Sequence, residues 1–224
     1  MRLDPATMPR VGTVGERLQS YNVEMAEVIG GTFWRPYGKG TAAIFGHQQA
    51  ATSAATPVGL DPALFERRPP VSLSDSGLRR LAAALGPAYV RVSGTWANAV
   101  YFHDSPGPAP SSGPAGFHGV LTRQQWAGVV EFAGAVDAEL VTSFATSSGT
   151  PDEKGVVDLG SGWRLLACTK SADGQIAAAE FMNEPTYAAM GGAPEGYDAA
   201  AYGHDIAVFQ RFLKQAASGT ICPP

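Results

Sequence analysis

Apolar positions along the chain follow two spacings in alternation, that of buried strands and that of amphipathic helices. Four short apolar runs predict strands at 18–29, 89–92, 140–144 and 176–184. Four stretches with helical spacing predict helices at 78–85, 126–133, 163–168 and 197–217. Each predicted strand is followed by a predicted helix, an alternation typical of parallel βα units with right-handed crossovers.

Capping and stop residues define several of these helices. Ser74 or Asp75 can cap the first, and Thr122 can cap the second. Gly219 is expected to stop the last helix. Between the periodic stretches lie irregular segments, the longest of them at 30–72, and loops of that length inside a compact domain are often functional. Trp34 in this segment could stack on a sugar ring or pack on its own domain.

The last predicted strand runs into Asn183-Glu184-Pro185. Because proline has no N–H and cannot continue a ladder, we expect the strand to stop at Glu184. An amide and a carboxylate would then lie at the carboxyl end of the strand, where parallel α/β barrels place their chemistry. From these residues alone, a strand end with a solvated glutamate is equally consistent. Asn22 and Glu24 share one face of the first predicted strand, which favours either a polar site or a half-exposed strand.

Composition narrows the possible functions. The 224 residues include 16 basic and 20 acidic side chains, which disfavours a nucleic-acid partner. No apolar run reaches the roughly 18–20 residues of a membrane span. The two cysteines and four histidines have no ligand spacing, so we expect neither a metal nor another cofactor. Residues 1–15 lack the apolar core of a signal peptide, and localisation stays open.

Three stretches resemble one family, the heparanase-like glycoside hydrolases (family 79). The run from Leu78 to Trp96, containing Tyr-Val-Arg-Val-Ser-Gly-Thr, resembles that family's first helix and second strand. Residues 20–25 and 179–185 resemble its first and fourth strands. The similarity extends over about 18–220 and is nearest to the bacterial β-glucuronidase branch. It implies an α/β protein of the (β/α)8 TIM-barrel type. Residues 18–224 would hold about the first four βα units, after an irregular segment at 1–17.

The resemblance also implies a retaining hydrolase that cleaves terminal β-linked glucuronic acid, so a carbohydrate would be the partner. Glu184 occupies the family's acid/base position. Asn183 would hydrogen-bond the sugar 2-hydroxyl, a contact that strengthens in the transition state. Glu24 and Thr95 match positions that line the sugar subsite nearest the cleaved bond. Related enzymes are often exported.

A retaining site needs a second carboxylate about 5–5.5 Å from the acid. In this family it is a glutamate at the end of the seventh strand, which the 224 residues do not reach. On a continuous strand, Glu180 would lie about 13 Å from Glu184, too far for that role. Glu24 would suit only the inverting separation of about 6.5–9.5 Å. We therefore expect the isolated chain to be inactive as a truncated half-barrel.

A half-barrel would also expose its sheet edges and an apolar sheet face, which predicts self-association. Two other functions stay open. The chain could belong to another Asn-Glu-Pro barrel glycosidase, a β-xylosidase or an endoglucanase. It could also be a non-catalytic remnant that binds sugar or another partner.

Overall fold

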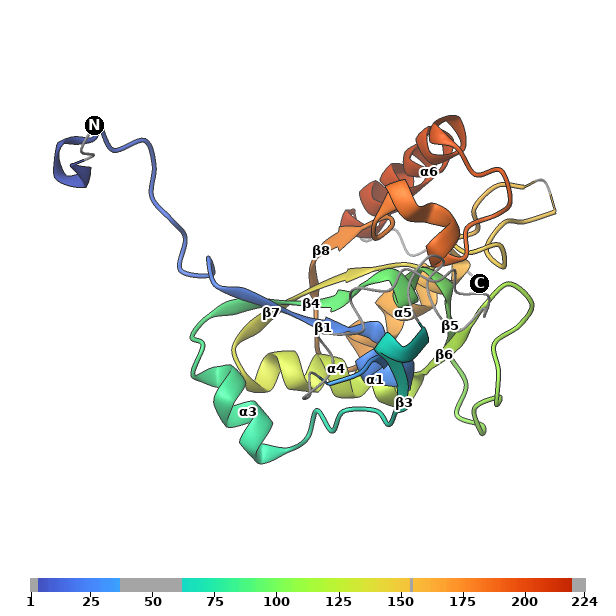
Figure 1. Ribbon diagram of the computed structural model, residues 1–224, viewed down its shortest axis with the longest axis horizontal. Coiled ribbons are helices and arrows are strands. Elements are labelled where there is room, and N and C mark those ends of the chain that lie inside the picture. The colour runs from blue at the N-terminus through green and yellow to red at the C-terminus, as the bar shows by residue number, and fades with distance from the viewer. Residues whose placement is uncertain (1–3, 37–61, 154, 219–224) are drawn as a thin grey trace.

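A parallel sheet of four strands forms the centre of the molecule, in the order β1-β4-β7-β8 (Figure 1). The structure is a computed structural model that describes residues 4–36, 62–153 and 155–218. The strands of the sheet are β1 (Ser20–Glu24), β4 (Ala88–Ser93), β7 (Ala138–Ser143) and β8 (Ile176–Glu180). Every neighbouring pair is parallel, as the sequence predicts.

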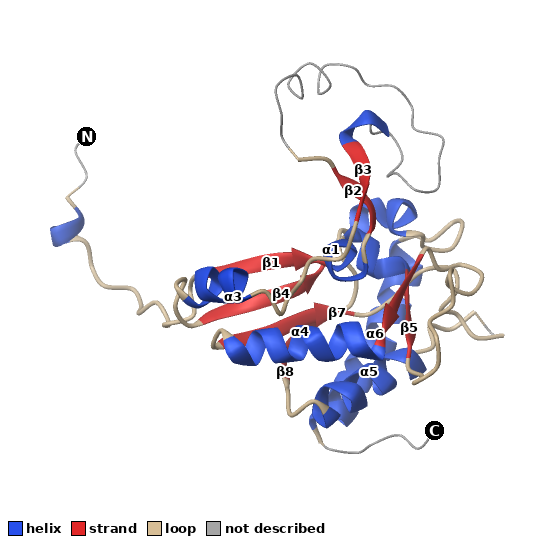
Figure 2. Cartoon of the chain, turned by 90° about the horizontal axis from the view of Figure 1, so that it is seen from below, coloured by secondary structure: helices blue, strands red, loops and turns tan. Residues whose placement is uncertain are grey.

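Four longer helices connect or follow these strands. They are α3 (Ser76–Ala83), α4 (Arg123–Ala135), α5 (Gly160–Ser171) and α6 (Ala199–Ala217). Helices α3 and α4 lie below the sheet in Figure 1 and in front of it in Figure 2, which is seen from below. The mixed α/β class and the strand–helix alternation are confirmed. The sheet is compatible with part of an α/β barrel, and the described residues do not close one.

Short strands and helices lie near the carboxyl ends of the four strands of the central sheet. Strand β2 (Gly31–Trp34) pairs antiparallel with β3 (Phe65–Arg68), and β5 (Val100–His103) pairs parallel with β6 (Gly119–Thr122). Helix α1 (Met25–Ile29) and the 3-10 helices η2 (Pro62–Leu64), η3 (Thr95–Ala99) and η4 (Pro185–Gly191) complete the set, while η1 (Pro5–Thr7) lies in the N-terminal segment that precedes β1 (Figure 1). Residues 37–61 of the expected irregular segment, and the helix stop at Gly219, lie outside the described residues.

The first strand is shorter than the predicted 18–29. It ends at Glu24, and the next residue, Met25, begins helix α1. The Glu24 N–H donates to the Glu27 carboxylate at 2.9 Å, which is half of a capping box at a helix start. Met25, Ala26 and Val28 are buried on the inner side of this helix. An apolar run of this length suits strand and helix equally, and here the capping residues decide between them.

The last strand is also shorter than predicted, since β8 ends at Glu180 rather than at Glu184. Phe181 and Met182 remain buried but leave the ladder. The Phe181 ring packs against α6, with its centroid 5.4 Å from that of Phe209. Aromatic packing on the helix therefore replaces the backbone pairing that we expected for these residues.

The core lies on the side of the sheet that the helices cover. Val90, Val92, Leu140 and Trp126 are each at most 2% exposed there. The opposite face carries mainly polar or small side chains, among them those of Asn22, Glu24, Arg91, Ser93, Ser143, Ala178 and Glu180, and the register also places Tyr89 and Val141 on it. The open face is therefore mainly polar, against the expectation of an apolar one, and Tyr89 and Val141 are its larger side chains with apolar surface.

Candidate active site

The last residues of the four strands form a polar row across the open face. Glu24 pairs in register with Ser93, and Ser143 pairs with Glu180. The Ser93 and Ser143 hydroxyls complete the row with a hydrogen bond of 2.7 Å. The row therefore has a carboxylate at each end, and it marks the carboxyl edge of the sheet.

Thr95, Asn183 and Glu184 meet just beyond this edge. The Thr95 hydroxyl donates to Glu184 Oε2 at 2.5 Å. Asn183 Nδ2 donates to Thr95 Oγ1 at 3.0 Å and to Glu184 Oε2 at 3.2 Å. Three of the four residues singled out in the sequence are thus in direct contact, although 88 positions separate Thr95 from Asn183.

Two further residues hold Asn183 in place. The side chain of Asn98, only 1% exposed, accepts from the Asn183 N–H at 3.1 Å and donates to the Asn183 carbonyl at 2.9 Å. Arg91 Nη2 donates to Asn183 Oδ1 at 2.8 Å. The amide oxygen therefore faces Arg91, and the amide nitrogen faces Thr95 and Glu184.

Arg91 also neutralises the carboxylate at the β8 end of the polar row. Its Nη2 lies 2.5 Å from Glu180 Oε1, an ion pair without hydrogen-bond geometry. Sequence analysis missed the roles of Arg91, Asn98 and Glu180. The available signal was the lone arginine inside the apolar strand 89–92, because a partly buried cation needs an anionic partner. Nothing in the sequence pointed to Asn98.

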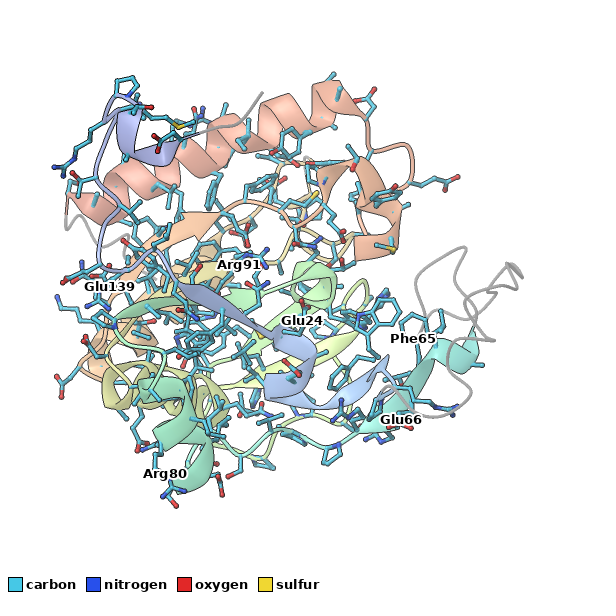
Figure 3. The ribbon with its side chains drawn as sticks, turned by 60° about the vertical axis from the view of Figure 1, so that its left-hand side comes forward. Glu24, Phe65, Glu66, Arg80, Arg91 and Glu139 are labelled. Atoms are coloured by element: carbon cyan, nitrogen blue, oxygen red, sulfur yellow. The ribbon has the colours of Figure 1, made fainter. Side chains whose placement is uncertain are left out.

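Glu24, the fourth predicted site residue, lies beside the others without a hydrogen bond to them among the described contacts. Burial raises the pKa of Glu24; Arg91 opposes this shift, and the carboxylates of Glu27, Glu184 and Glu180 reinforce it. Figure 3 shows Glu24 and Arg91 on neighbouring strands near the middle of the molecule. Glu24 therefore belongs to the same charge cluster as Glu184.

The Glu24 carboxylate lies directly against the backbone of Gly94. A Cβ atom added at position 94 would overlap Glu24 Oε2. Gly94 also has φ 101°, a conformation that L side chains rarely adopt. A glycine between Ser93 and Thr95 is thus what lets the carboxylate of β1 approach the end of β4.

Glu184 has a left-handed backbone, with φ 49° and ψ 61°. Pro185 disfavours the right-handed helical conformation for the residue before it, and the left-handed one is uncommon for a side chain such as glutamate. Strained backbone of this kind clusters at functional sites. The Glu184 side chain is exposed in the described part of the chain, so it is accessible to solvent.

Trp34 packs on its own domain while staying 42% exposed. Its ring stacks on Phe65 with centroids 4.7 Å apart and meets Trp96 edge-on at 6.3 Å. The packing alternative is confirmed, and the exposed part of the ring leaves the sugar-stacking alternative open.

Over the described ranges, no group of three or more His, Cys, Asp or Glu side chains is placed to hold a metal ion. No helix there is long and apolar enough to cross a membrane. No protein-family model and no curated protein sequence matches the chain.

Proposed function

We propose that this chain carries the acid/base half of the active site of a retaining glycoside hydrolase. The observation that carries the proposal is the contact between Glu184, Thr95 and Asn183 at the carboxyl edge of a parallel sheet. The resemblance of 78–96 and 179–185 to heparanase-like enzymes supports a β-linked terminal glucuronic acid as the substrate.

In this proposal Glu184 protonates the glycosidic oxygen and later deprotonates the attacking water. Both hydrogens of Asn183 Nδ2 are engaged, by Thr95 and by Glu184. A sugar 2-hydroxyl would take the place of one of these acceptors. Arg91 keeps the amide in the orientation that this exchange requires, because it holds the amide oxygen.

The nucleophile would come from a part of the barrel beyond the described strands, facing the polar row across the barrel mouth. It should lie about 5–5.5 Å from the Glu184 carboxyl. Four parallel strands with helices on one face are what the first half of a (β/α)8 barrel would contribute. The 224-residue chain by itself is expected to bind a glucuronide without hydrolysing it.

The test is to read the gene past the codon for Pro224 and to assay the whole product on 4-nitrophenyl β-D-glucuronide. Glu184→Ala should lower kcat by about 10²–10⁴-fold. Added azide should restore turnover and yield a glycosyl azide, because a small anion can replace the base-activated water. Glu195→Ala, an exposed glutamate in the loop before α6, is the matched control.

The same assay separates the alternatives. A preference for aryl β-xyloside, or cleavage of cellulose oligomers, would assign the site to a β-xylosidase or an endoglucanase instead. Sugar binding in calorimetry without turnover by the whole product would indicate a non-catalytic sugar-binding protein. A whole product that neither binds nor cleaves any of these sugars contradicts the proposal.

A further inference from the structure

The side chain of Asn98 contacts both ends of η4, the short helix that follows Glu184. At the start, it bonds the N–H and the carbonyl of Asn183, the residue before the N-cap Glu184, at 3.1 Å and 2.9 Å. At the end, it packs against the buried Gly191, where an added Cβ would overlap Asn98 Nδ2. One side chain therefore holds the segment on either side of the proposed acid/base residue and its helix.

Asn98 is itself fixed in the fold. It is 1% exposed, and its carbonyl accepts from the Thr146 N–H, in the segment after β7, at 2.8 Å. It belongs to η3, the same short helix whose Thr95 hydroxyl donates to Glu184 Oε2 at 2.5 Å. Helix η3 thus holds the backbone before Glu184 with one side chain and the Glu184 carboxylate with another.

The backbone of Glu184 needs such support. Its φ of 49° and ψ of 61° are left-handed, a conformation that persists in a residue with a side chain only where the surrounding structure over-determines it. No ladder supplies that support, because β8 ends at Glu180. The two hydrogen bonds from Asn98 to Asn183 stand in for the strand pairing that this segment lacks.

We propose that Asn98 is a positioning residue for the acid/base. By holding Asn183 and the end of η4 together, it fixes the left-handed backbone of Glu184 and so the direction of the Glu184 carboxyl. The effect on catalysis rests on the proposed function, and the effect on the backbone does not. Asn98 acts only through Glu184 and Asn183 and contacts no reacting atom.

The kinetic test compares two leaving groups in the whole gene product, read past the codon for Pro224. Phenolate leaves poorly and needs the proton from Glu184, whereas 2,4-dinitrophenolate leaves almost without it. Asn98→Ala should lower kcat/KM for phenyl β-D-glucuronide by about 10²-fold, the cost of misplacing a reacting group by about 1 Å. For 2,4-dinitrophenyl β-D-glucuronide the loss should be about threefold at most. A merely structural defect would lower both values equally, because it removes active protein.

Gly191→Ala tests the same contact without deleting a hydrogen-bonding group. The backbone of Gly191 is not left-handed, so alanine fits the chain, but its methyl group displaces the Asn98 amide. It should show the same selective loss on the phenyl glucuronide, and it should add little to Asn98→Ala, where that amide is gone. Gly203→Ala is the matched control and should change neither rate, because it is an exposed position of α6 with nothing within 4 Å of an added Cβ.

The backbone is tested in the 224-residue chain by NMR, with no need for turnover. The Cα and Cβ chemical shifts of Glu184 should report a left-handed residue in wild type and in Gly203→Ala. They should move away from that conformation in Asn98→Ala and in Gly191→Ala. A Glu184 that stays left-handed in both variants overturns the inference.

The two readouts separate failure of the inference from failure of the proposed function. A glucuronidase in which Asn98→Ala lowers both kcat/KM values equally keeps the proposed function and refutes the positioning role. A whole gene product that cleaves no glycoside, while the Glu184 shifts still depend on Asn98, refutes the proposed function and leaves the backbone part of the inference supported.

Discussion

Glu24 is a buried carboxyl whose pKa is raised above its ordinary value of 4.5, first by burial. Between the ordinary and the raised pKa, the folded chain holds a proton that the unfolded chain has released. The free energy of unfolding therefore falls as pH rises through this window. Glu24→Gln stays neutral and should lose this pH dependence, so it should gain stability relative to wild type as pH rises.

Urea unfolding at intervals between about pH 4 and about pH 8 checks this sign. Glu195→Gln, the same substitution at an exposed glutamate, should follow the wild-type profile. Parallel profiles for wild type and Glu24→Gln would show that the Glu24 carboxyl is not shifted on folding.

The second prediction at the residue scale concerns the side chain of Asn98. Its side chain satisfies both backbone groups of Asn183, at 3.1 Å and 2.9 Å. Asn98→Ala should therefore lower the free energy of unfolding by about 2–4 kcal/mol, the cost of two partly buried groups left unpaired. Asn22→Ala, at an exposed position of β1, should change it by less than about 0.5 kcal/mol. Equal effects in urea unfolding would mean that water replaces Asn98.

At the scale of elements, a buried hydrogen bond between two side chains joins helices α4 and α5. Trp126, fully buried in α4, donates its indole N–H to Thr169 Oγ1 of α5 at 2.8 Å. Thr169→Val keeps the shape but leaves the N–H unpaired, so it should cost about 1–3 kcal/mol. Thr169→Ser keeps the acceptor and should cost less.

A double-variant cycle isolates this bond. In the Trp126→Phe background there is no indole N–H, and Thr169→Val should then cost less than it does alone. Urea unfolding of the four proteins gives the coupling free energy. Strictly additive costs would show that the hydrogen bond contributes nothing beyond packing.

Long elements with regular apolar spacing and a capping residue could be predicted from the sequence, while short elements could not. Helix α4 begins after Thr122, whose hydroxyl accepts from the Gln125 N–H at 3.1 Å, and its predicted stripe is buried. Strands β2, β3, β5 and β6 have four residues each, too few for a periodic signal. The break after Glu24 was missed because its apolar residues suit a strand and a helix equally.

Some residues of the candidate site could likewise be predicted from the sequence, and others could not. The Asn-Glu-Pro motif carries a local signal, and it pointed to Asn183 and Glu184, whereas Thr95 was named only through the resemblance of 78–96 to a known family. The contacts of Arg91 with Asn183 and of Asn98 with Asn183 span 92 and 85 positions. No local pattern encodes such pairs, because they depend on the folded sheet, which brings β4 and the segments after β4 and β8 to the same edge.

At the scale of the whole molecule, β1 and β8 are the outer strands of an open parallel sheet. Each presents an edge with backbone groups that no described strand pairs, and such edges favour pairing with another chain. Parallel edges of opposite kind, β1 of one copy and β8 of another, can join without reversing either sheet. We therefore expect the 224-residue chain to self-associate through these edges.

Light scattering after gel filtration, over a dilution series, measures this association. Ala178→Lys adds a charge to an exposed position of β8 and should raise the dissociation constant about tenfold, since charged edges resist pairing. Ala217→Lys, at an exposed position in the last turn of α6, is the control and should not change it. A monomer at every concentration would show that the edges are protected. Association unchanged by Ala178→Lys would place the interface elsewhere, on the polar open face or on the helices.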